Sequence, residues 1–317
     1  MLILGLGLFA TLVVGGLGVY GALQLTRPRR LSSTDTADRW GLPPPEVETL
    51  VSRDGLRLAG WWFGHPSATA SVVVAHGRGG DKRTSLWVAA DLFPTYNVLL
   101  LDLRGHGESS GSCSSVGYLE RLDVLGAVDW LLERVGQQPV GVLGISMGGA
   151  AAIQAAAESP AIGAVVADSP FARLYSPVRE AICARGYPRA VSPVLAWSVC
   201  TVASWLGTPR GPWRDPLDVV ARIAPRPLLI IHGQADQMIP VENAHVLLDR
   251  AGPSAEAWIL PEVGHAQAAA IEPAGYSARV KRFFEAALRA PGQPAAHAAA
   301  GHGDDVGQRQ LQEIDRG

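Results

Sequence analysis

Short apolar runs alternate with longer amphipathic stretches between about residue 46 and residue 290. An apolar run of roughly four to eight residues bounded by turn residues is typical of a buried strand, and a longer stretch with helical spacing is typical of a helix. Strands that alternate with helices imply βαβ units, so the pattern predicts an α/β fold with a mostly parallel sheet covered by helices on both faces. The expected strands are Glu46–Ser52, Leu56–Phe63, Ser71–Ala75, Asn97–Leu101, Val140–Leu143, Gly163–Ala167, Pro227–Ile231 and Glu256–Leu260.

Most segments between these strands have the apolar spacing of helices. The first two strands are an exception, because the turn signal Arg53-Asp54-Gly55 joins them, and we expect an antiparallel hairpin there. The expected helices are Thr84–Phe93, Leu119–Val135, an Ala-rich segment that begins at Gly149, Val241–Arg250 and Tyr276–Arg289.

Residues 171–224 break the alternation. This segment is rich in Trp, Pro and Ala and lies between two expected core strands. An insertion of this length between strands is commonly a lid over a binding site, and its most apolar part, Val194–Leu206, would then line an acyl pocket. Extra helices packed on the core are the open alternative.

The N-terminal segment is apolar throughout, without a charged residue from Leu2 to Leu25. As a helix it would be about 36 Å long, enough to cross the hydrocarbon core of a bilayer with some tilt. We expect residues 1–26 to be a transmembrane anchor, with a signal peptide or a buried helix as alternatives. A signal peptide has basic residues before its apolar core, whereas Arg27, Arg29 and Arg30 follow it here. The same arginines favour a cytoplasmic location for the rest of the chain.

Three further regions follow from composition. Residues 27–45 are polar and then Pro-rich (GLPPPE), which predicts a stiff linker. Residues 46–290 form the expected main domain. Residues 291–317 contain few large apolar residues, which predicts a disordered tail.

Charge and cysteine content narrow the function classes. A net charge of −2 provides no basic field for nucleic acid. The three cysteines lack C-x-x-C spacing, and no metal-binding or Walker motif is present, so we expect neither a metal nor a cofactor. Residues 16–21 (GLGVYG) fit the dinucleotide pattern G-x-G-x-x-G, but no strand precedes them, so we interpret the match as a consequence of glycine abundance.

Residues 140–158 (VGVLGISMGGAAAIQAAAE) carry the main candidate chemistry. A buried strand runs into a sharp turn and then a helix, which is the context that the nucleophile-elbow motif G-x-S-x-G requires. The flanking glycines let strand and helix approach closely, and Ser146 is the candidate nucleophile. The motif occurs a second time around Ser109, where no strand leads directly into it and no helix follows at once, so we interpret Ser109 as a loop residue.

A serine hydroxyl needs an adjacent base that is itself held by an acid. On such a scaffold the chain order is Ser, Asp or Glu, then His. His265 lies in the loop after the last expected strand and is the candidate base. Asp236 follows the preceding strand and is the favoured acid, with Asp168 as its competitor. The other histidines precede the acid, lie in a predicted surface helix or belong to the tail: His65, His76, His106, His232, His245, His297 and His302.

The tetrahedral intermediate of acyl transfer needs hydrogen-bond donors for its oxyanion. One would be the backbone N–H of Met147, directly after the nucleophile. The other would come from the glycine-rich loop after the Ser71–Ala75 strand, where we choose the N–H of Arg78.

Together these segments resemble the α/β-hydrolases, in particular single-domain, often membrane-anchored serine hydrolases of the serine aminopeptidase-like and esterase-like branch. The resemblance covers about residues 46–288. It rests on His76-Gly77 as oxyanion-loop signature, LLLDLRGHGESSG after the fourth strand, GISMGG as elbow, PRPLLIIHGQADQMIP with Asp236 in the acid position and VGHAQA as histidine loop. It implies an α/β-hydrolase fold and a Ser-Asp-His triad. Relatives of this kind include esterases, lipases, thioesterases, peptidases and depalmitoylating enzymes.

We therefore expect a serine hydrolase that cleaves ester or related acyl bonds through an acyl-enzyme, without a cofactor. A peptidase or thioesterase on the same scaffold and a non-catalytic, membrane-tethered binding module are the alternatives. The expected partners are a small acyl substrate and, through the N-terminal helix, a membrane. An anchor beside an apolar insertion favours a lipophilic substrate.

Overall fold

The computed structural model describes residues 2–30, 33–207 and 214–289. Within them, eight strands form one sheet in the order β1-β2-β4-β3-β5-β6-β7-β8. The pairs β1–β2 and β2–β4 are antiparallel, and every other pair is parallel. The strands are β1 (Glu46–Val51), β2 (Arg57–Phe63), β3 (Ser71–Ala75), β4 (Asn97–Leu101), β5 (Val140–Ile145), β6 (Ile162–Asp168), β7 (Leu228–Gly233) and β8 (Ala255–Leu260).

Both faces of the sheet are buried, which explains why its central strands are apolar without interruption. On β3, Val73 and Ala75 belong to one apolar cluster, whereas Val72 and Val74 belong to another on the opposite face. Successive side chains of a strand point to opposite faces, so a strand covered on both sides needs an apolar residue at every position. The predicted mostly parallel, doubly covered sheet is confirmed.

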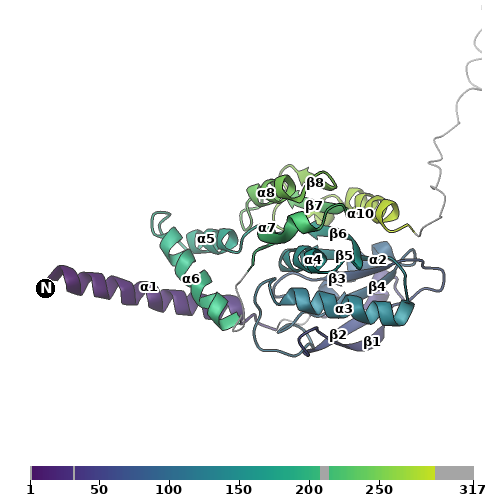
Figure 1. The fold of residues 1–317 in the computed structure, drawn as a ribbon, viewed down its shortest axis with the longest axis horizontal. Helices are drawn as coiled ribbons and strands as arrows, with labels where there is room; N and C mark the ends of the chain where they lie inside the picture. Colours follow the sequence, from purple (N-terminus) through teal and green to yellow (C-terminus); the bar gives the residue numbers. More distant parts are fainter. Residues whose placement is uncertain (1, 31–32, 208–213, 290–317) are drawn as a thin grey trace, which may run out of the picture.

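The helices divide between the two faces. The first cluster includes residues of α3 (Glu120–Val135), α4 (Met147–Glu158) and α8 (Glu242–Ala251). The second includes residues of α2 (Leu86–Leu92) and α10 (Pro273–Ala287). Figure 1 shows α3 and α4 lying across the sheet on the near face. The remaining short elements are η1 (Ala37–Trp40), η2 (Lys82–Ser85), η3 (Val220–Arg222) and α9 (Ala268–Ile271).

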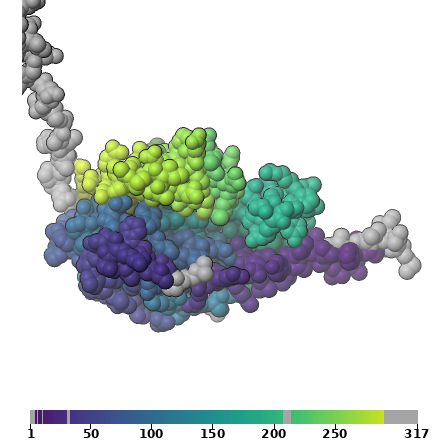
Figure 2. Space-filling view, turned by 180° about the vertical axis from the view of Figure 1, so that it is seen from behind, coloured from purple at the N-terminus to yellow at the C-terminus, as the bar shows by residue number. Residues whose placement is uncertain are grey.

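The insertion between β6 and β7 is helical. It contains α5 (Tyr175–Ala184), α6 (Ser192–Gly207) and α7 (Pro216–Val219). In Figure 1, α5 and α6 extend away from the sheet on the same side as the N-terminal helix. Figure 2 shows the same arrangement from behind, with the teal insertion seated on the purple helix.

The N-terminal helix α1 covers Leu2–Thr26. Its segment Gly7–Thr26 is long and apolar enough to cross a membrane by length and composition, as an anchor or a signal sequence would be, and only 12% of the apolar window is buried. Beyond α1, Ala37 and Leu42 are buried in the second apolar cluster, so part of the expected linker packs on the main domain. The expected disordered tail lies outside the described residues.

Candidate active site

Ser146 lies between β5 and α4 in a conformation that few residues adopt. Its φ is 54° and its ψ −112°, and a non-glycine residue with positive φ at a sharp turn is strained. A Cβ atom on Gly144 would lie 2.2 Å from the Gly148 carbonyl oxygen, and one on Gly148 would lie 2.1 Å from that of Ala75. The strand and helix therefore approach as closely as the two glycines allow, and the turn projects Ser146 at the carboxyl edge of the sheet.

The structure brings Ser146 together with both predicted partners. His265, in the loop after β8, has its Nε2 3.0 Å from Ser146 Oγ. Its Nδ1 lies 2.7 Å from Asp236 Oδ2. With a proton on Nδ1, the imidazole donates to Asp236 and accepts from the Ser146 hydroxyl. This is the orientation in which a histidine can receive a serine proton.

Asp236 is fixed in place by its own loop after β7. Its side chain is fully buried, and Oδ1 accepts hydrogen bonds from the backbone N–H groups of Met238 (2.9 Å) and Ile239 (2.8 Å). Its other oxygen, Oδ2, faces His265. The carboxylate is thus held in one rotamer, with one oxygen for the loop and one for the imidazole.

Asp168, the competing acid, serves a different contact. It ends β6, and its Oδ1 accepts a hydrogen bond of 2.9 Å from the Ser169 hydroxyl. Burial raises the pKa of Asp168 to about 6, against the opposing effect of that hydrogen bond. Ser169 Oγ in turn accepts from the Ala266 N–H at 3.1 Å, beside His265. Sequence reasoning missed this support of the histidine loop, because nothing in the pattern around Ser169 signals a contact 97 residues away.

The expected oxyanion loop passes against the elbow. A Cβ atom on Gly77 would lie 3.6 Å from the Ser146 Cβ atom. Met147 is the first residue of α4, and the N–H groups of a first helical turn have no partner within their helix. Met147 and Arg78 thus lie on the two segments that meet beside Ser146.

His76 stabilises the expected oxyanion loop, the segment that follows β3. It is buried, its Nδ1 lies 2.7 Å from the Gly77 carbonyl oxygen, and its Nε2 accepts from the Leu103 N–H at 3.1 Å. Burial, together with the neighbouring His106, lowers the pKa of His76 to about 4. His76 is therefore neutral and ties the loop after β3 to the loop after β4.

The Arg78 side chain has a contact that the sequence did not predict. Its Nε donates to the Leu25 carbonyl (3.1 Å) and Nη2 to that of Gln24 (2.5 Å), at the C-terminal end of α1. The last carbonyls of a helix lack partners within it, so the guanidinium caps α1. The residue expected to help form the oxyanion hole is also the residue that joins this loop to the N-terminal helix.

Ser109, in the second copy of the motif, is buried in the loop after β4. Its hydroxyl donates to the Asp102 carbonyl (2.6 Å) and accepts from the Ala59 N–H (2.8 Å). Backbone groups thus bind the Ser109 hydroxyl both as donor and as acceptor, which indicates a structural role for this serine.

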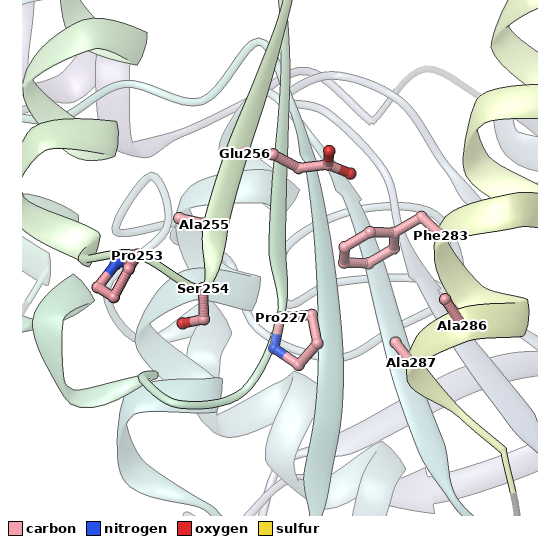
Figure 3. Close-up of a pocket in the computed structure, with 8 residues that line it drawn as sticks. All are labelled: Pro227, Pro253, Ser254, Ala255, Glu256, Phe283, Ala286 and Ala287. Carbon is pink, nitrogen blue, oxygen red and sulfur yellow. The ribbon is translucent and has the colours of Figure 1, made fainter.

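Metal-site and surface features elsewhere do not compete with this site. In the described part of the chain, no group of three or more His, Cys, Asp or Glu side chains is arranged to hold a metal ion. A surface depression between the starts of β7 and β8 and helix α10 is lined by Pro227, Pro253, Glu256 and Phe283 (Figure 3). It lies at the amino ends of these strands, opposite to the edge that carries Ser146.

Comparisons with known proteins agree with this architecture. The family model described as alpha/beta hydrolase fold matches residues 70–181. Among sequence relatives, the uncharacterized protein YfhR of Escherichia coli O157:H7 is 29% identical over 244 residues, 72% of this chain and 77% of YfhR. Lysophosphatidylserine lipase ABHD12 of Macaca fascicularis is 28% identical over 201 residues, 59% of this chain and 47% of that protein. Among solved structures, Pyrococcus furiosus esterase Pf2001 aligns with a TM-score of 0.71 and 24% identity, over 84% of this chain and 99% of the esterase.

Proposed function

We propose that this chain, which belongs to the α/β-hydrolase superfamily and has its fold, is a serine hydrolase of acyl esters. Membership of the superfamily supports hydrolase activity. The observation that supports the finer proposal is the hydrogen-bonded series from Asp236 through His265 to Ser146, with distances of 2.7 and 3.0 Å. Such a series beside a free helix N-terminus fits acyl transfer.

In the proposed reaction, Ser146 Oγ attacks the substrate carbonyl carbon while its proton passes to His265 Nε2. The backbone N–H groups of Met147 and Arg78 donate to the resulting oxyanion, and Asp236 stabilises the imidazolium. Collapse of the tetrahedral intermediate breaks the bond to the leaving group, which takes the proton from His265. A water molecule, deprotonated by His265, then releases the acid and restores Ser146.

We further propose that α1 anchors the enzyme in a membrane. The uncharged sequence and the low burial of α1 support the anchor. The esterase and lipase among the similar proteins support a small acyl substrate, and an anchored enzyme would meet a lipophilic one.

The proposal is tested by labelling the full-length protein in detergent with a fluorophosphonate, which phosphonylates only an activated serine. Labelling is expected for the native protein and for Ser112→Ala, an exposed serine of the loop after β4. Ser146→Ala is expected to show none. Equal labelling of native protein and Ser146→Ala would contradict the assignment of the nucleophile.

The two aspartates provide a matched pair in the same assay. Asp236→Asn is expected to slow labelling by roughly 10³- to 10⁴-fold, because the histidine loses the partner that fixes its tautomer. Asp168→Asn is expected to slow it far less, since the Asp168 carboxyl contacts Ser169. The reverse order would make Asp168 the acid.

A further inference from the structure

Helix α6 presents an apolar face to solvent. Its sequence, SPVLAWSVCTVASWLG, has no charged residue. Val194, Trp197 and Trp205 are 54%, 65% and 76% exposed, and their spacing places them on one side of the helix. Large apolar side chains gathered on one exposed face mark a contact with a partner or a membrane.

An adjoining side of α6 packs closely on α1. Ser198 Oγ donates to the Val14 carbonyl at 3.2 Å, a hydrogen bond between the two helices. A Cβ atom on Gly18 would lie 2.0 Å from Ser198 Oγ, and one on Gly21 would lie 2.6 Å from a methyl group of Val199. Small residues that let two backbones approach, with a hydroxyl that bonds across, are typical of helix pairs within membranes.

The position of this contact along α1 limits where α6 can lie. A helix needs about 20 residues to cross the hydrocarbon core of a bilayer, and the apolar segment of α1 is Gly7–Thr26. The contact with α6, from Val14 to Gly21, falls inside that segment. If α1 crosses the bilayer, α6 must enter it as well. The 16 residues of α6 reach about 24 Å, too short to span, so α6 would enter the bilayer without crossing it.

The carboxyl edge of the sheet is joined to the C-terminal end of α1. The Arg78 guanidinium binds the Gln24 and Leu25 carbonyls, and the Ser114 N–H donates to the Thr26 carbonyl at 2.7 Å. The loops after β3 and β4 are therefore fixed to the end of α1. Figures 1 and 2 show α1 and α6 projecting together from one end of the molecule.

We propose that the exposed face of α6, defined by Val194, Trp197 and Trp205, is a second membrane-contacting surface, embedded in lipid beside α1. This contact holds the candidate active site at the bilayer surface. The enzyme therefore hydrolyses acyl esters dissolved in the bilayer in preference to esters in water. The substrate selection rests on the proposed function, whereas the membrane contact rests on the proposed anchor alone.

The membrane contact is tested without reference to catalysis. In a full-length background with Cys113, Cys183 and Cys200 replaced by Ser, a single cysteine at Trp197→Cys is labelled with the fluorophore NBD. The protein is reconstituted into phosphatidylcholine vesicles with nitroxide-bearing acyl chains. The control is Val47→Cys, an exposed position on the edge strand β1.

Strong nitroxide quenching at position 197 and little at position 47 would support the proposal. Equal quenching at both positions would overturn it. A blue-shifted but unquenched probe at position 197 would also overturn it, because another protein surface, such as a second copy of the chain, would then cover α6.

Substrate selection is tested with Trp197→Glu, which places a carboxylate on the lipid-facing side, and with Val47→Glu as control. Turnover of a long-chain ester in vesicles is expected to fall roughly tenfold in Trp197→Glu, since a charge in the leaflet is costly. Turnover of a short water-soluble ester should stay close to native. An equal loss on both substrates would overturn the proposed selection. If the native protein hydrolyses neither ester, the proposed function fails, while the quenching result still decides the membrane contact.

Discussion

Two segments of this protein share the pattern Gly-x-Ser-x-Gly, and the fold uses them in opposite ways. Around Ser146 a strand runs straight into a helix, so the serine is forced to a φ of 54° with its hydroxyl 3.0 Å from His265. Around Ser109 the chain is a loop between β4 and α3, and the hydroxyl is taken up by two backbone groups. The same five-residue pattern therefore places one serine hydroxyl beside a histidine and buries the other among backbone groups, according to the elements that flank it.

The loop around Ser109 is held by buried polar contacts. The fully buried Lys82 ammonium lies 2.7 Å from Asp102 Oδ2 and 2.6 Å from Glu108 Oε2, within the motif itself. Asp102 Oδ2 also accepts the Glu108 N–H at 2.8 Å. One region thus strains its backbone and directs the Ser146 hydroxyl to His265, whereas in the other region backbone groups bind the Ser109 hydroxyl.

The largest expected difference is between the two serine-to-alanine variants. In Ser146→Ala, kcat/KM for a short ester should fall by about 10⁵-fold or more, while the free energy of unfolding stays near native, because alanine keeps the Cβ atom and with it the same backbone strain. In Ser109→Ala, activity should remain within a few-fold, but the free energy of unfolding should fall by about 1–3 kcal/mol because the Ala59 N–H loses its acceptor. Ester turnover and urea denaturation measure both effects. A large loss of activity in a stably folded Ser109→Ala would remove the distinction.

The last glycine of each motif gives the next contrast. Gly148→Ala places a Cβ atom 2.1 Å from the Ala75 carbonyl oxygen, so we expect a loss of about 3 kcal/mol or more in the free energy of unfolding. Gly111→Ala meets its nearest atom at an ordinary 3.4 Å, and its φ of 93° alone should cost about 1–2 kcal/mol. Thermal or urea unfolding of the two variants ranks them. Equal losses would mean that the elbow relaxes more readily than its packing indicates.

The last expected effect concerns His76, which joins the two regions through Gly77 and Leu103. Its pKa is lowered to about 4, below the ordinary value of 6.5, because burial disfavours the charged ring. Between these values the unfolded chain binds a proton that the folded chain does not. The contribution of neutral His76 to the free energy of unfolding is therefore fully present above pH 6.5. The free energy of unfolding should fall by about 2 kcal/mol between pH 7 and pH 5.

Urea denaturation at several pH values tests this expectation. The slope of the free energy of unfolding against pH should be smaller in His76→Gln. It should be native-like in His245→Gln, which alters an exposed histidine on α8. An unchanged slope in His76→Gln would assign the acid sensitivity to other groups.

Much of the architecture could be predicted from the sequence, because local pattern and tertiary environment agree there. The continuous apolar run Ser71–Ala75 and the turn at Arg53-Asp54-Gly55 each indicated the element that forms. Two bounds at the site differ from the prediction: β5 continues to Ile145 rather than ending at Leu143, and α4 begins at Met147 rather than at Gly149. Glycine has a low helix propensity, so the sequence pattern predicted that the helix begins after the glycines. The close packing of strand and helix nevertheless requires glycine in the first helical turn.

The sequence by itself determined which residues were candidates for the site and their order along the chain. Ser146, Asp236 and His265 follow from motif context and from the edge of the sheet at which parallel strands end. The tertiary arrangement settles which carboxylate faces the imidazole and which serine hydroxyl lies beside the histidine. It also determines that the Arg78 side chain binds the C-terminal end of α1 and that α6 packs on α1. These contacts join residues that are far apart in sequence. They depend on distances of about 3 Å between side chains and backbone, and no local pattern encodes such distances.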